Sequence, residues 1–91
     1  GLVIVDVSNT NCLKVVSVVE GFKKPNSVAV QFRYAFVTDE EGLKVVDITM
    51  PEKAKLIPEG KVDLHHAHNV YVARTYAYVA NGADGVAIID V

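Results

Sequence analysis

The chain has 91 residues, of which 51% are hydrophobic and 22% charged, so it is long enough for one small globular unit and too short for two. Nine lysine and arginine residues against 11 aspartate and glutamate residues give a net charge of −2 without a block of either sign, which argues against a nucleic-acid partner. The apolar runs never approach the ~18 to 20 residues of a transmembrane helix. The single cysteine, Cys12, excludes an internal disulfide and is interpreted as an incidental thiol.

One motif occurs three times along the chain. Residues 1–7 are GLVIVDV, residues 42–48 are GLKVVDI and residues 85–91 are GVAIIDV. A second motif, VAVQFRYAFV at 28–37, returns as VYVARTYAYV at 70–79. Two motifs that return in the same order at nearly the same offset indicate a repeat of about 42 residues.

The residues of one period predict four short strands. In chain order we expect strands at 26–32, 34–39, 43–48 and 54–63, joined by tight turns and by a polar connection that contains Pro51. The runs are short and rich in Val, Ile, Tyr and Phe, which is typical of strands, whereas helices would need longer stretches with apolar positions three and four residues apart. The pattern therefore predicts an all-β fold, a β-propeller segment of four-stranded antiparallel blades.

The strand at 2–5 and its copies are nearly continuous apolar runs, which is typical of strands that are covered on both faces. The run Leu2-Val3-Ile4-Val5-Asp6 resembles the signature of the LVIVD repeat, a propeller-forming repeat of bacterial and archaeal surface or exported proteins. The resemblance covers almost the whole chain. It implies an extracellular, cell-surface or periplasmic setting, and its hydrophobic signature specifies the fold rather than the function.

The phase of the repeat predicts a single partial propeller domain over 1–91. If strands are counted from the channel outward, the chain contains the outer half of one blade with a linker (1–25), a complete blade with a linker (26–67) and the first three strands of the next blade (68–91). Such a segment exposes apolar faces and strand edges. We expect these faces and edges to be covered by other blades of a longer propeller or by identical subunits. A propeller typically has about 4 to 8 blades.

All three histidines lie just before the innermost strand of the second copy, at His65, His66 and His68. In a strand, His66 and His68 would share one face and could bind a transition metal, with Asp63 as a third ligand or as an orienting partner. The equivalent stretch of the preceding copy, 23–27, is the unrelated KKPNS. Ordinary loop histidines are therefore the favoured interpretation, and a metal site is the alternative.

Asp6, Asp47 and Asp90 recur at the end of each copy of the first motif, which predicts a structural role as acceptors for the backbone of the following turn. The acidic segments 39–42 and 81–85 lack the ligand spacing of an EF-hand loop and are interpreted as hairpin turns whose glycines supply positive φ.

Four tyrosines divide between two expected roles. Those of the second strands, Tyr34, Tyr76 and Tyr78, are expected to pack between blades, whereas Tyr71 on the inner strand could face a ligand.

Three functions are compatible with these observations. The favoured one is a non-enzymatic scaffold that binds other proteins, with no catalytic residue, no cofactor and no named ligand. The second is part of a metal-dependent propeller enzyme or redox protein that uses the His65–His68 cluster. The third is a self-assembling ring of partial propellers.

Overall fold

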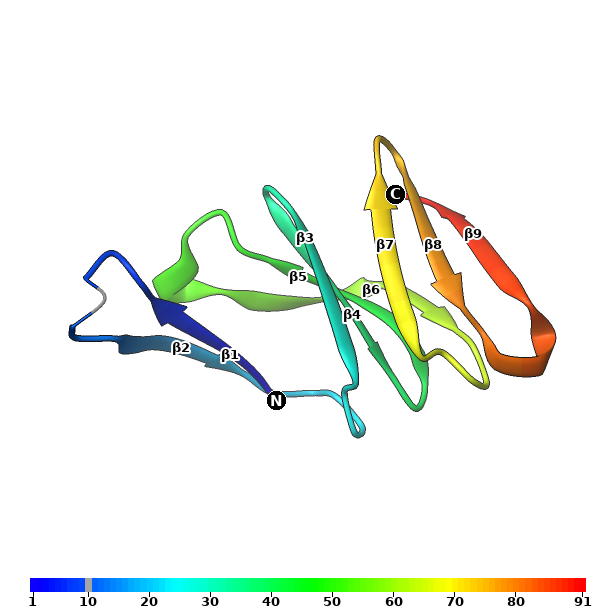
Figure 1. Cartoon of the computed structure of the whole chain (residues 1–91), viewed down its shortest axis with the longest axis horizontal. Helices are drawn as coiled ribbons and strands as arrows, with labels where there is room; N and C mark the ends of the chain where they lie inside the picture. Colours follow the sequence, from blue (N-terminus) through cyan, green and yellow to red (C-terminus); the bar gives the residue numbers. More distant parts are fainter. Residues whose placement is uncertain (10) are drawn as a thin grey trace.

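The computed structural model describes residues 1–9 and 11–91. In this part of the chain nine strands form, with two single-turn 3-10 helices between them (Figure 1). The elements are β1 (Leu2–Asp6), β2 (Lys14–Val19), β3 (Ser27–Gln31), β4 (Tyr34–Asp39), β5 (Gly42–Asp47), η1 (Pro51–Lys53), β6 (Lys55–Asp63), β7 (Asn69–Ala73), β8 (Tyr76–Ala80), η2 (Gly82–Asp84) and β9 (Val86–Asp90).

The strands form three antiparallel sheets in chain order. The first sheet is β1-β2, the second is β3-β4-β5-β6 and the third is β7-β8-β9. Figure 1 shows them in sequence along the longest axis of the molecule, with the N-terminus in the first sheet and the C-terminus in the third. The second sheet is a four-stranded meander, so the predicted all-β fold of antiparallel propeller blades is confirmed.

The strand boundaries differ from the predicted ones where a glycine or a helical turn intervenes. Gly42 adopts a φ of +135° and pairs with Asp39, so β5 begins one residue before the predicted start. Ala54 caps η1 by donating its backbone N–H to the Pro51 carbonyl, so β6 begins at Lys55.

The side chains of β4 alternate between the two neighbouring sheets. Ala35 and Val37 are buried in a cluster with Val19 of the first sheet, whereas Phe36 is buried in a cluster with Val79 of the third. Strand residues point alternately to opposite faces of a sheet, so apolar residues in consecutive positions give β4 two apolar faces. The second sheet is therefore packed on both sides.

The outer faces of the first and third sheets are exposed. Val3 is 52% exposed in the first sheet, and Tyr71 and Ile88 are 68% and 64% exposed in the third. Tyr34 packs against the cluster between the second and third sheets, whereas Tyr76 and Tyr78 lie on the exposed face of the third sheet. The repeat thus places aromatic side chains on one face of the second sheet and of the third sheet, and they are buried where a neighbouring sheet covers that face.

No helix among the described residues is long and apolar enough to cross a membrane.

Candidate functional site

Four connections meet at one end of the stacked sheets, which we name the loop end. They are the β2–β3, β4–β5, β6–β7 and β8–β9 connections, seen at the lower side of Figure 1. Backbone hydrogen bonds join the first three, since Glu40 donates its N–H to the Lys23 carbonyl at 2.8 Å and Leu64 donates to the Glu41 carbonyl at 3.1 Å. The β8–β9 connection is joined to them by the Asn81 side chain, which accepts the His66 N–H at 2.9 Å. The loop end is therefore a connected surface rather than a set of independent loops.

An open hollow of about 530 Å³ lies at the loop end, between the β2–β3 and β6–β7 connections. It is lined by Lys24, Asn26, Glu40, His65, His66, Ala67 and His68. The Lys24 ammonium lies 3.5 Å from the Glu40 carboxylate, so the hollow contains an ion pair beside the three histidines. The hollow is therefore a polar candidate site with charges of both signs.

The histidines do not lie on a strand, so the predicted sharing of one strand face by His66 and His68 is wrong. Strand β7 begins only at Asn69, and the chain bends at His65 and His66. The His66 N–H donates to the Asn81 Oδ1 at 2.9 Å, and Ala67 is buried against the cluster between the second and third sheets. These two interactions hold the segment away from an extended strand.

The structure places Asp63 at the end of β6, opposite Gly42, and it is not among the residues that line the hollow. Within residues 1–9 and 11–91, no group of three His, Cys, Asp or Glu side chains is arranged to hold a metal ion. The assignment of a metal to His66, His68 and Asp63 stays a prediction.

His68 occupies the position that Asn26 occupies in the preceding repeat. Both donate their backbone N–H to the end of the neighbouring strand, Asn26 to Thr38 and His68 to Ala80, each at 2.9 Å. The Asn26 side chain also donates to the Ala67 carbonyl of the next repeat at 3.0 Å and accepts from the Thr38 hydroxyl at 2.6 Å. In the second sheet the residue at this position, Asn26, therefore ties one sheet to the next.

A buried ion pair, Asp39 with Lys44, connects the second sheet to the β2–β3 connection. The Lys44 ammonium donates to Asp39 Oδ2 at 2.9 Å, to Glu41 Oε1 at 2.5 Å and to the Gly21 carbonyl at 3.1 Å. The Asp39 carboxylate also accepts the backbone N–H groups of Lys23, Glu41 and Gly42. Each charge of the pair thus has several partners, as a buried charge requires.

The partners of the pair decide the direction of both pKa shifts. Burial alone would raise the pKa of Asp39, but the hydrogen bonds from Lys44, Lys23 and Glu41 outweigh it and lower this pKa below its ordinary value. Burial alone would likewise lower the pKa of Lys44, but its bonds to Glu41 and Asp39 raise it. The pair is therefore fully charged at neutral pH.

The next repeat replaces both members of this pair by neutral residues. Asn81 stands in the place of Asp39 and Ala87 in the place of Lys44. Asn81 keeps one function of Asp39, because its Oδ1 accepts the His66 N–H as Asp39 accepts that of Lys23. The exchange removes one positive and one negative charge together, so no unpaired charge is left between the sheets.

The recurring aspartates lie at the end opposite the loop end. Asp6 Oδ1 accepts the Ser8 N–H at 2.8 Å, and Asp47 Oδ1 accepts the Thr49 N–H at 2.9 Å and the Thr49 hydroxyl at 2.6 Å. These bonds lower the pKa of both carboxyl groups. Asp90 ends β9 opposite Tyr76.

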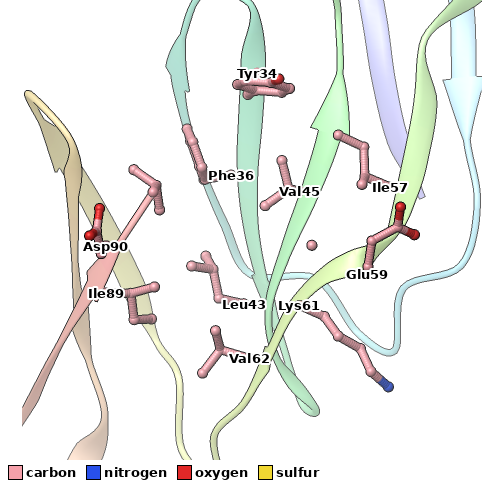
Figure 2. Close-up of a pocket in the computed structure, with 12 residues that line it drawn as sticks. Tyr34, Phe36, Leu43, Val45, Ile57, Glu59, Lys61, Val62, Ile89 and Asp90 are labelled. Carbon is pink, nitrogen blue, oxygen red and sulfur yellow. The ribbon is translucent and has the colours of Figure 1, made fainter.

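A second candidate is the apolar cleft between the second sheet and β9, shown in Figure 2. It has a volume of about 320 Å³, and Phe36, Val45 and Ile57 line it from the second sheet, with Ile89 and Asp90 on the other side. At the other side of the second sheet, Leu56 of β6 packs against the equivalent cluster. The cleft therefore lies where a fourth strand beside β9 would place its side chains.

We predict that Asp39 and Lys44 are energetically coupled. Asp39→Asn and Lys44→Ala should each lower the free energy of unfolding by about 3 kcal/mol, because each leaves one buried charge without its main partner. The double variant, which reproduces the natural Asn81 and Ala87 pair, should lose at least about 1 kcal/mol less than the sum. Urea denaturation of the full chain measures these values, and strictly additive losses would contradict the coupling.

The free energy of unfolding of the natural chain and of these variants should also depend differently on pH. Because the pKa of Asp39 is lowered in the folded chain, its carboxylate stabilises the fold above the ordinary aspartate pKa, and this contribution is lost as the pH falls through the folded-state pKa. Unfolding free energies measured from pH 7 downward should therefore fall less steeply for the double variant than for the natural chain.

Gly82 is predicted to position the histidine segment. Gly82 and Gly85 have φ values of +58° and +85°, so alanine strains the backbone at both positions. The cost should be about 1 kcal/mol at Gly82 and larger at Gly85, whose ψ of −140° puts it in a region that essentially only glycine adopts. A Cβ atom at Gly82 would lie 2.8 Å from the Cβ of His66, whereas one at Gly85 would meet nothing within 4 Å. Gly82→Ala should therefore shift the amide resonances of His66 and His68, and Gly85→Ala, the control, should not. Equal shifts in both variants would contradict this role.

Comparison with known families agrees with the repeat seen in the sequence and the sheets. The family model of the LVIVD repeat matches residues 1–20, 24–62 and 65–91, which corresponds to one match for each sheet. No curated protein and no solved structure matches the chain. The three matches together span nearly all of the sequence, and the chain belongs to the LVIVD-repeat family of β-propeller repeats.

Proposed function

We propose that this chain is a non-enzymatic propeller module of a surface or exported protein, and that its loop end binds a partner protein. The family resemblance supports the surface setting. The proposal assigns no catalytic residue and no cofactor, and treats the histidines as part of a contact surface.

The observation that carries the proposal is the connected polar surface of the loop end. Its connections are tied to one another by backbone hydrogen bonds and by the Asn26 and Asn81 side chains. A surface held in one conformation loses little conformational entropy on binding, which favours affinity for a protein partner. The hollow beside His66 gives the surface a concave shape. The ion pair of Lys24 and Glu40 gives it one positive and one negative charge.

The exposed faces of the first and third sheets also support further blades as neighbours. Val3, Tyr71 and Ile88 are apolar or aromatic side chains that lie exposed on these faces. A further sheet packed on each face would bury them, as the third sheet buries Phe36 of the second. We favour blades of a longer propeller as these neighbours, with identical subunits as the alternative.

A site-specific photocrosslinker tests the loop end. We expect a crosslinker at His66 of the full protein to capture a discrete protein from the envelope of the source cells. The control position is Thr75, which is exposed in the β7–β8 turn at the opposite end. Capture at His66 and not at Thr75 would support the proposal, and capture at both positions or only at Thr75 would overturn it.

A further inference from the structure

The β5–β6 connection and the β3–β4 turn enclose a second polar hollow, which we name the basic hollow. It has a volume of about 420 Å³ and is lined by Arg33, Asp47, Thr49, Met50, Lys53 and Lys55. It lies at the end of the second sheet opposite the loop end, so it is separate from the surface proposed above. Three cations and one carboxylate give it a net positive charge in a chain whose net charge is −2.

The sheet register brings these charges together. Asp47 of β5 lies opposite Tyr34 of β4 on one side and opposite Lys55 of β6 on the other. The Ile48 N–H donates to the Arg33 carbonyl at 2.9 Å, which fixes the β3–β4 turn beside the connection. Arg33 and Lys55 are 22 positions apart in the sequence, and both thus face the Asp47 carboxylate.

Arg33 is held in place by an aromatic ring. Its guanidinium carbon lies 5.2 Å from the centroid of the Tyr34 ring, within the range of a cation–π interaction. Stacking on a ring leaves the N–H groups at the edge of the guanidinium plane able to bind an anion. Asp47 does not neutralise the hollow alone, because one carboxylate faces three cations and its Oδ1 already accepts two hydrogen bonds from Thr49.

The repeat itself does not require this charge. In the first copy Asp6 and Ser8 stand in the places of Asp47 and Thr49, so the capped turn is common to both copies. Cys12, however, stands in the place of Lys53. In the third copy Thr75 stands in the place of Arg33. The blade fold therefore does not depend on Arg33 or Lys53. Their positive charges repel one another in the basic hollow, and a bound anion would reduce this repulsion.

We propose that the basic hollow binds a phosphate or sulfate ester. An arginine fork with two lysine ammonium groups suits the oxygens of a tetrahedral oxyanion. The Met50 side chain is 53% exposed at the wall of the hollow and gives the organic group of an ester an apolar surface. Arg33 and Lys53 carry the oxyanion, and Met50 contacts the organic group.

The test is a titration of the full chain, followed by NMR, with inorganic phosphate, inorganic sulfate, phenyl phosphate and phenyl sulfate at low salt. We expect saturable shifts of the Arg33 Nε–H and Thr49 amide signals, and tighter binding of each phenyl ester than of its inorganic ion. Lys53→Gln and Arg33→Gln should each weaken the binding about tenfold, the usual effect of losing one charged hydrogen bond.

The matched control is Lys14→Gln, because Lys14 is the equivalent of Lys55 in the first copy, where Cys12 replaces Lys53. This variant removes one charge and should leave the affinity unchanged. Lys53→Gln lies on an exposed helical turn and tests the site even if Arg33→Gln perturbs the β3–β4 turn. Shifts that do not saturate, or an equal loss of affinity in Lys14→Gln, would overturn the proposal by showing general charge attraction only.

Discussion

Each sheet in this chain is apolar on both faces, and that constraint explains how the sheets are arranged. In β4, Ala35 and Val37 need cover on one side and Phe36 needs cover on the other. Burying a side chain of the size of Phe36 stabilises a fold by roughly 2 to 3 kcal/mol, so a sheet with two such faces is stable only between neighbours. The repeat satisfies this need by placing small residues such as Ala77 and Val79 against the aromatic face of the preceding sheet.

The polar interactions of the loop end are a consequence of the packing of the sheets. When two sheets pack, the connection between them crosses the end of the seam, and its backbone N–H groups need acceptors. Asp39 and Asn81 provide that acceptor in successive repeats, for Lys23 and for His66. The Asp39 carboxylate requires the Lys44 ammonium beside it, whereas the neutral Asn81 amide requires no cation. This difference explains why the aspartate and the lysine are replaced together in the next repeat. The loop end is thus ordered by the same seams that bury the apolar faces.

The sequence predicts the repeat, the fold class and the strand positions because these depend on local residue pattern. It does not predict the bend at His66, because the acceptor of the His66 N–H is Asn81, fifteen residues away in the β8–β9 connection. Lys44 is the one charge in an otherwise apolar run, a signal that could have marked the buried pair, yet its partners at Gly21 and Asp39 come from different elements. The basic hollow is missed for the same reason, since Arg33 and Lys53 meet only when the second sheet has formed.

The central claim is that the second sheet buries its aromatic face against the third. Nuclear Overhauser effects from the ring protons of Phe36, measured in the full chain, test it most directly. We expect cross-peaks from this ring to methyl groups of Ala77, Val79 or Ile89, which share its buried cluster. A Phe36 ring that shows no cross-peak to the third sheet and is broadened by a soluble paramagnetic probe would contradict the account.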